Sequence, residues 1–319
     1  MKLSRFTAAA TACAVGLTLL PAIAYANDTI ELRYKAKVGE KSIYQSSLTT
    51  EVNQSINGKD VDTTFEQSDV TTYTVKKIAE DGTIIFETQI ERLKVEGEFA
   101  PQVTFKFDSQ SDDHDTTSQI GAAITPLYER LSGAILGVEV TPLGKVKKVN
   151  GYIQLLQDVL KDNPIAQRFA GGGSEEAAVS NFQDLFVLFK EESVKPGDTW
   201  DKPYKVKMPG LGEFAGKRNY TYVGPDKVGE IPTLRITIDT DLSGDLDIDM
   251  GATKVSGKFE TDSASGTVQF DPASGRILSM DLEQTFSGDL TIEAGGMTIP
   301  VNFSQTLKNT RKLVDKIPE

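Results

Sequence analysis

The stretch DTDLSGDLDID, Asp239–Asp249, decides the fold, because it reads either as a metal-binding loop or as a strand. From Leu234 to Met250, the even-numbered positions are mainly apolar and the odd-numbered positions are polar or charged. Successive side chains of a β-strand point to opposite faces of the sheet. The alternation therefore predicts one long strand with a buried apolar face and a solvated acidic face.

A calcium loop is the alternative interpretation. Asp239, Asp241, Ser243 and Gly244 match the early ligand and turn positions of the EF-hand template. Met250, however, stands where that loop requires a glutamate that binds the ion through both oxygens. The flanking residues alternate as in a strand, whereas an EF-hand loop lies between helices. The sequence favours the strand and predicts no metal ligands here.

A second copy of the motif supports this interpretation. LSGDLDIDMGA (Leu242–Ala252) returns 44 residues later as FSGDLTIEAGG (Phe286–Gly296). Glu283 and Thr285 replace the two leading aspartates, so the repeat retains the strand pattern and a mid-strand glycine but not the acidic ligands. A glycine inside a strand predicts a bulge or a sharp bend, which a curved sheet needs.

Alternation also dominates both ends of the chain. It begins at Ile30–Val38 and continues past the turn signals Asn57-Gly58 and Asp81-Gly82, then returns after Lys195. We expect a mainly β (α+β) fold in which curved antiparallel sheets form an open or partial barrel, with a helical middle segment. The expected parts are a signal peptide (1–26), an N-terminal β meander (27–117), a helical middle segment with a short hairpin (118–194) and a C-terminal antiparallel β region (195–319), with 27–319 as one compact unit.

The middle segment carries several helix signals. Thr125 and Pro126 indicate a helix start, Asn150 is placed to cap a second helix, and Ser174 to cap a third. The third helix has an apolar stripe at helical spacing, which consists of Ala178, Phe182, Leu185, Phe186 and Phe189. Core packing of this helix on a sheet is one interpretation. The sharper one makes Phe182, Phe186 and Phe189 the wall of a hydrophobic cavity for a lipid-like ligand.

The first residues have the features of a secretory signal peptide. Lys2 and Arg5 precede the apolar run Ala8–Leu20, and Ala24-Tyr25-Ala26 forms a small-residue cleavage site. Cleavage there leaves 293 residues without cysteine, and the net charge changes from −12 to −14. We expect a secreted or periplasmic protein with no thiol chemistry, no affinity for nucleic acid and no transmembrane segment in the mature chain.

The sequence contains only weak matches to known catalytic motifs. His114 lies among Asp112, Asp113 and Asp115, which indicates either a metal site or a solvated polar loop. Gly171–Ser174 lacks the Gly-Lys-Ser/Thr ending of a P-loop and favours a flexible joint. Trp200 is the only tryptophan, too few for a carbohydrate cleft, and fits a packing anchor. We expect no cofactor and no enzyme activity, with a carboxylate-dependent hydrolase as the least favoured alternative.

Four short phrases in order resemble a family of secreted bacterial proteins known only as a domain of unknown function. They are VGEKSIYQ (38–45), VTPLGKVKKVNG (140–151), VKPGDTWD (194–201) and FDPASGRILSM (270–280). The resemblance covers most of the chain and implies no catalytic or binding residues. The expected fold is also loosely similar to periplasmic lipoprotein-carrier half-barrels. The expected role is a non-enzymatic binding or carrier module for an apolar ligand, or alternatively a structural or protein-interaction component of the cell envelope.

Overall fold

The computed structural model describes residues 29–99, 103–112, 114–161, 163–169, 174–208, 212–249 and 253–318. The expected signal peptide and the joint at Gly171–Gly173 lie outside these residues. The strands are β1 (Lys41–Ile56), β2 (Lys59–Ile78), β3 (Ile84–Phe99), β4 (Val103–Asp108), β5 (Ile135–Val140), β6 (Val146–Asn150), β7 (Thr199–Met208), β8 (Gly212–Val228), β9 (Ile231–Asp249), β10 (Thr253–Asp271), β11 (Arg276–Ala294) and β12 (Met297–Val314). The helices are α1 (Gln119–Leu131), α2 (Tyr152–Leu160), α3 (Pro164–Phe169) and α4 (Glu175–Gln183).

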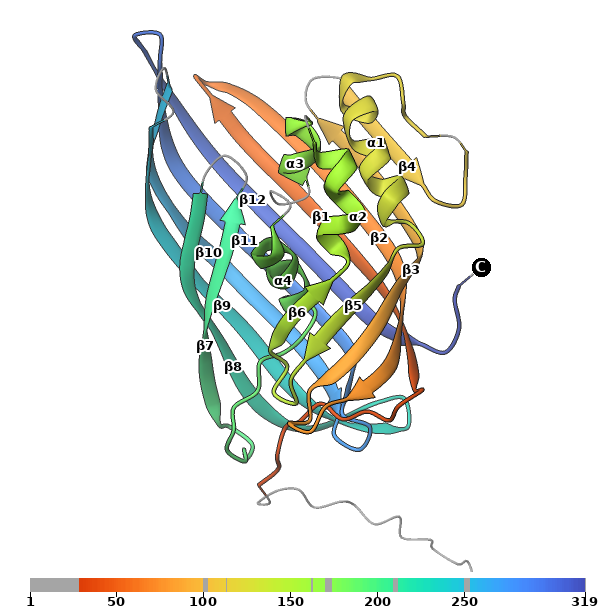
Figure 1. The fold of residues 1–319 in the computed structure, drawn as a ribbon. Helices are drawn as coiled ribbons and strands as arrows, with labels where there is room; N and C mark the ends of the chain where they lie inside the picture. Colours follow the sequence, from red (N-terminus) through yellow and green to blue (C-terminus); the bar gives the residue numbers. More distant parts are fainter. Residues whose placement is uncertain are drawn as a thin grey trace, which may run out of the picture.

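All twelve strands belong to one antiparallel sheet that curls around a concave face (Figure 1). Its order is β6-β5-β3-β2-β1-β12-β11-β10-β9-β8-β7, and β4 pairs with the far end of β3. β1 pairs with β12 from Ile43↔Val314 to Ile56↔Val301, which joins the two β regions into a single sheet. The order ends at β6 and β7, so the sheet is not closed. The expected open or partial barrel with a helical middle segment is confirmed.

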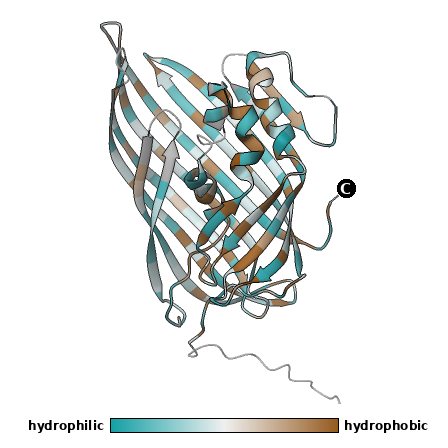
Figure 2. Ribbon diagram, viewed as in Figure 1, coloured by the Kyte–Doolittle hydropathy of each residue, from teal (hydrophilic) through white to brown (hydrophobic). Residues whose placement is uncertain are grey.

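The acidic stretch lies within β9, as the alternation predicts. Asp239, Asp241 and Asp245 are exposed, whereas Leu242 and Leu246 on the opposite face are buried. Figure 2 shows the same alternation of hydrophilic and hydrophobic residues along the long strands. The stretch therefore has a strand's geometry and does not form a loop between helices.

The repeated glycines have a different role from the bulge that the sequence predicts. Gly244 of β9 and Gly288 of β11 both lie directly opposite Phe259 of β10, and Gly288 also lies opposite Phe303 of β12. The register shifts fall on β10 after Glu260 and Thr261 rather than at the glycines. The glycines leave room for aromatic rings, which alternate with them across four strands.

Three apolar clusters fill the concave face. The largest lies at the end of the barrel where the chain enters, and it collects Tyr34, Tyr44, Phe189 and Phe270 with residues of α2 and α4. A second cluster of phenylalanines lies within β8 to β12. In the third, α1 packs on β3 and β4. None of the helices within the described residues is long and apolar enough to cross a membrane.

Several local predictions were wrong. Ile30–Val38 alternates in burial, but its β pairing is the isolated bridge Ile30↔Val194, because it runs inside the curved sheet rather than along a neighbouring strand. Pro126 lies inside α1, and Ser118 rather than Thr125 caps that helix by accepting a hydrogen bond from Gly121 N. The N-terminus of α2 is at Gly151, with no side-chain capping bond from Asn150.

Candidate functional site

Residues 174–194, here named the closing segment, lie between the two free edges of the sheet (Figure 1). Ser174 caps α4 by accepting a hydrogen bond from Ala177 N at 3.1 Å, as predicted. Gln183 then binds the hairpin of β5 and β6: its Oε1 accepts from Val146 N and its Nε2 donates to Gly144 O, each at 2.9 Å. The Gln183 amide therefore occupies part of the free edge of β6.

The other side of the closing segment binds β7 and β8. Arg218 Nη1 donates to Asp184 Oδ1 at 3.0 Å. Trp200 Nε1 donates to Leu188 O at 2.7 Å, and its indole stacks on Tyr220. Trp200 is thus the packing anchor that the sequence predicts. The segment bridges both edges of the open sheet.

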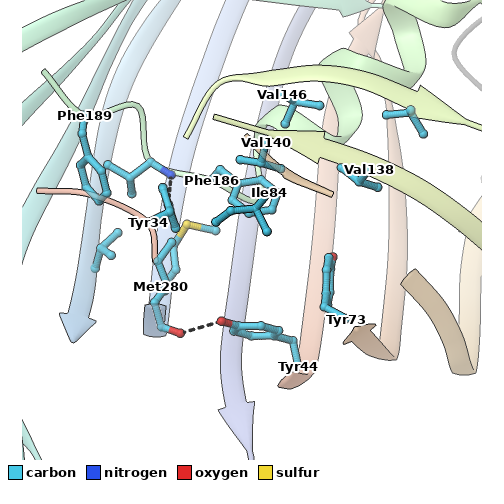
Figure 3. Close-up of a cluster of buried hydrophobic side chains, with 14 of the residues drawn as sticks. Tyr34, Tyr44, Tyr73, Ile84, Val138, Val140, Val146, Phe186, Phe189 and Met280 are labelled. Atoms are coloured by element: carbon cyan, nitrogen blue, oxygen red, sulfur yellow. Dashed lines mark hydrogen bonds between the residues drawn. The ribbon is translucent and has the colours of Figure 1, made fainter. Parts of the chain in front are cut away.

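Tyr34 fixes the centre of this arrangement. Its hydroxyl accepts a hydrogen bond from Val187 N at 2.8 Å. Its ring lies 5.0 Å from Phe189 and 5.6 Å from Phe186, measured between centroids (Figure 3). The centroid of the Phe270 ring is 5.9 Å away. Burial raises the pKa of the Tyr34 hydroxyl far above its usual range, so this group stays neutral.

A groove of about 470 Å³ lies between α4 and strands β7 and β8. Its apolar lining comes from both sides and comprises Val179, Phe186, Leu188, Pro203, Tyr204 and Tyr220. Its charged lining is balanced in sign: Lys147, Lys205 and Arg218 against Glu175, Glu176 and Asp184. The groove therefore offers apolar walls with mixed charges beside them.

Arg218 forms a fixed charge in the lining of the groove. Its guanidinium lies 3.8 Å from the centroid of the Tyr204 ring, in cation–π contact. Burial alone disfavours a charged side chain, but Tyr204 and Asp184 raise the pKa of Arg218 above its ordinary value. Burial also raises the pKa of the Asp184 carboxyl above its ordinary value, and Arg218 opposes that shift. The Tyr204 ring and Asp184 together hold the guanidinium in place.

A cavity of about 40 Å³ lies on the other side of Phe186. Arg311 lines it and is only 3% exposed; its Nη1 donates to Leu185 O at 2.6 Å. Its guanidinium lies 3.9 Å from the centroid of Tyr44 and 5.0 Å from that of Tyr73. Arg276 reaches the same cavity and pairs with Glu40 at 3.1 Å.

Asp69 of β2 lies near this cavity and accepts a hydrogen bond from Thr71 Oγ1 at 2.7 Å. Burial raises the pKa of its carboxyl above the ordinary value of 3.8, and Thr71 and Arg311 oppose that shift. The carboxyl therefore retains a proton at higher pH in the folded protein than in the unfolded chain.

We predict a pH-dependent difference in stability between the wild type and Asp69→Asn. Because the folded pKa is raised, the wild type is favoured at low pH, and that advantage declines as the pH rises from about 3.8 through the folded pKa. Urea unfolding of both proteins between pH 3.5 and 8 measures it. A difference that stays constant over that range, or that grows with pH, contradicts the assignment.

The three phenylalanines predicted as a cavity wall have different surroundings. α4 ends at Gln183, so only Phe182 lies on the helix. Phe186 follows it and lines both the groove and the small cavity. Phe189 lies in the core against Tyr34 and Phe270, and Phe182 is half-buried against the same core.

Sequence reasoning missed Arg218 and Arg311. Both stand at positions of their strands that point to the concave face, since Arg218 shares its parity with Tyr220 and Tyr222, and Arg311 with Val301 and Phe303. An arginine on the buried side of an alternating strand is the signal that identifies them, because an ionised side chain is rarely buried without a partner.

His114 is half-buried, not solvated as in the loop interpretation. Its ring lies 4.4 Å from that of Phe107, and Nε2 is 2.9 Å from Asp108 O. Within the part of the chain that the structure describes, no group of three His, Cys, Asp or Glu side chains is placed to hold a metal ion.

The four phrases that carry the family resemblance meet around the closing segment. Gly144 lies against Val187 and Tyr34, and Gly275 lies against Lys35. Tyr44 donates to Ile277 O at 3.0 Å, and Trp200 binds Leu188 O as described above. Sequence segments that are far apart along the chain thus lie together at one end of the curved sheet.

The chain belongs to the family of unknown function DUF6263, whose model matches residues 81–277. No curated protein matches the sequence at a significant level.

Solved structures are loosely similar. A structure described as "lipid-protein interactions in lipovitellin" has 8% identity and a TM-score of 0.40; the match covers 89% of this chain but only 26% of the lipovitellin chain. The β domain of the Bordetella autotransporter BrkA has 9% identity and a TM-score of 0.20, over 85% of this chain and 98% of its own. An outer membrane channel from Pseudomonas putida F1 has 9% identity and a TM-score of 0.20, over 88% and 98%.

Proposed function

We propose that this member of DUF6263 is a non-enzymatic binding or carrier module, and that the groove between α4 and β7–β8 takes one lipid-like ligand. The observation that carries the proposal is the groove itself: about 470 Å³, with apolar walls from α4, β7 and β8 and an ion pair in its lining. Pockets for small organic ligands range from about 300 to 1,000 Å³, so its size fits. The proposal includes export, with cleavage after Ala26, to the periplasm or the exterior.

The charges indicate the polar part of the ligand. Three basic and three acidic side chains line the groove, and Arg218 is already paired with Asp184. A ligand with one net charge gains little from such a balanced lining. An uncharged or zwitterionic polar group fits better, because it meets both signs at short range.

The apolar walls set how affinity depends on chain length. Each methylene removed from water contributes about 0.8 kcal/mol, equivalent to about a fourfold gain in affinity. Alkylphosphocholines of increasing length, each below its micelle concentration, are therefore expected to bind about fourfold more tightly per methylene until the groove is filled. Titration calorimetry measures the series. Affinity that does not change with chain length contradicts the proposal.

A groove-filling variant tests the location. Ser180 of α4 lines the groove, whereas its exposed neighbour Asn181 does not. Ser180→Trp is expected to weaken dodecylphosphocholine binding at least about tenfold by occupying the space of the ligand, while Asn181→Trp leaves it within about twofold. Equal effects of the two substitutions place the ligand elsewhere.

Native mass spectrometry of the protein isolated from its own envelope separates the remaining alternatives. A co-purifying lipid supports the carrier. A stable protein partner without lipid favours a structural or interaction component. Asp184 does not support the alternative of a carboxylate-dependent hydrolase, because its carboxylate is paired with Arg218.

A further inference from the structure

The cavity behind Phe186 has an excess of positive charge. Arg311 and Arg276 line it together with the exposed Lys35, whose ammonium donates to Pro272 O, and Glu40 is the acid among its lining residues. Glu40 neutralises Arg276, at 3.1 Å. In a chain with a net charge of −12, such a concentration of cations around a small enclosed space is unusual and calls for a counter-charge.

Arg311 is the centre of this excess. Among the described residues, no carboxylate lies within ion-pair distance of its guanidinium, although the side chain is 3% exposed. One Nη donates to Leu185 O, while Nε has no partner. The rings of Tyr44 and Tyr73 stabilise the cation in part through their π faces. Asp69 is too far for an ion pair, and burial favours its neutral form.

Arg276 repeats the pattern on the same cavity. Its Nη1 contacts Glu40 and Ser42 Oγ at 3.1 and 3.3 Å, and its Nε also lacks a partner. Buried guanidinium donors without acceptors are costly, and a bound anion supplies both the acceptors and the missing charge. Two such side chains from β11 and β12 therefore converge on one small space.

We propose that this cavity binds one small anion of the size of a carboxylate group. Its volume of about 40 Å³ accommodates about three water-sized positions, which matches the three heavy atoms of a carboxylate and excludes a larger anion such as a nucleotide. The anion is either a free ion or the carboxylate end of a longer molecule. The site goes beyond the proposed groove: Phe186 lies between the two, so failure of one does not remove the other.

Bromide and formate are the probes for a free ion. Crystals of the wild-type protein soaked in bromide are expected to show anomalous density within the cavity. In solution, formate and bromide are expected to raise the thermal unfolding midpoint in a saturable manner at constant ionic strength. Arg276→Met, at the partly exposed rim, is expected to weaken that apparent affinity at least about tenfold. Arg235→Met, which removes an exposed arginine paired with Asp226, is the matched control and leaves it unchanged.

Decanoate distinguishes the second source. If it binds in competition with bromide and more tightly than formate, the anion is the end of a longer molecule; if only the small ions bind, it is free. Arg311→Met is expected to give the same loss as Arg276→Met where that variant folds. The bromide soak uses the wild-type protein, so that test does not require either variant. A cavity that holds only water in the bromide-soaked crystal, or stabilisation that persists unchanged in Arg276→Met, overturns the proposal.

Discussion

Replacement of Gly144 by alanine is expected to lower the free energy of unfolding by at least about 3 kcal/mol. Gly144 ends the β5–β6 turn with φ +84°, a conformation that costs other residues about 1–2 kcal/mol. A Cβ at this position collides with the carbonyl of Val187 and with the Tyr34 ring. Since Val187 and Tyr34 are held by their own hydrogen bond, neither yields without detaching the closing segment from the hairpin.

Gly39 provides the matched control. It has nearly the same φ, +85°, but a Cβ there meets no atom within 4 Å. Gly39→Ala is therefore expected to cost only about 1 kcal/mol, which isolates the collision at Gly144 from backbone strain. Urea unfolding of the three proteins measures both terms. Equal losses from the two substitutions show that the closing segment is not packed on the hairpin as described.

Gly144→Ala also connects the fold to the proposed function. The closing segment supplies one wall of the groove, so its displacement is expected to abolish dodecylphosphocholine binding under conditions where the variant remains folded. Gly39→Ala retains binding. The pair thus separates loss of the groove from a general loss of stability.

The strands of this protein are readable from its sequence because period-two alternation reports directly which side chains are buried. β9 is an example: apolar residues alternate with its aspartates, and this alternation distinguishes the strand from a calcium loop. Alternation does not report which strand lies beside which, because register and partner depend on distant residues. The pairing of β1 with β12, which makes one sheet out of two predicted β regions, therefore emerged only in the structure.

The candidate site was predictable to a smaller extent. The apolar stripe of the third predicted helix includes Phe186, which lines the groove, but the same stripe predicted helix through Phe189. The chain leaves helical conformation after Gln183, because the residues that follow form hydrogen bonds with distant parts of the chain. Asp184 binds Arg218, Leu185 binds Arg311 and Val187 binds Tyr34. Tertiary partners of this kind override helical periodicity, and a single sequence does not reveal them.

The repeated glycine motif is recognised correctly in the sequence, but the bulge that it predicts is not at these glycines. A mid-strand glycine indicates either a bulge or a close approach, and the sequence alone does not choose between them. Here a Cβ at Gly244 would meet the Phe214 ring, and a Cβ at Gly288 would collide with the Phe303 ring and with Lys258 O. In both copies of the motif the glycine therefore allows the close approach of an aromatic ring.

That arrangement makes Phe259 the residue whose truncation is expected to have the largest effect in the second cluster. The ring is 1% exposed and lies 4.4 Å from Phe214, 5.4 Å from Phe286 and 5.9 Å from Phe303, measured between centroids. Its removal leaves a space between these three rings, and the glycines directly opposite on β9 and β11 have no side chain to fill it. Phe259→Ala is expected to cost about 3–5 kcal/mol, the upper part of the range for such changes.

Phe259→Leu is the control, since it preserves most of the volume and is expected to cost about 1.5 kcal/mol or less. Urea unfolding followed by far-UV and near-UV circular dichroism measures both variants, and coincident transitions show that the sheet unfolds as one unit. A loss below about 1 kcal/mol for Phe259→Ala, or equal losses for the two variants, contradicts the role of this ring.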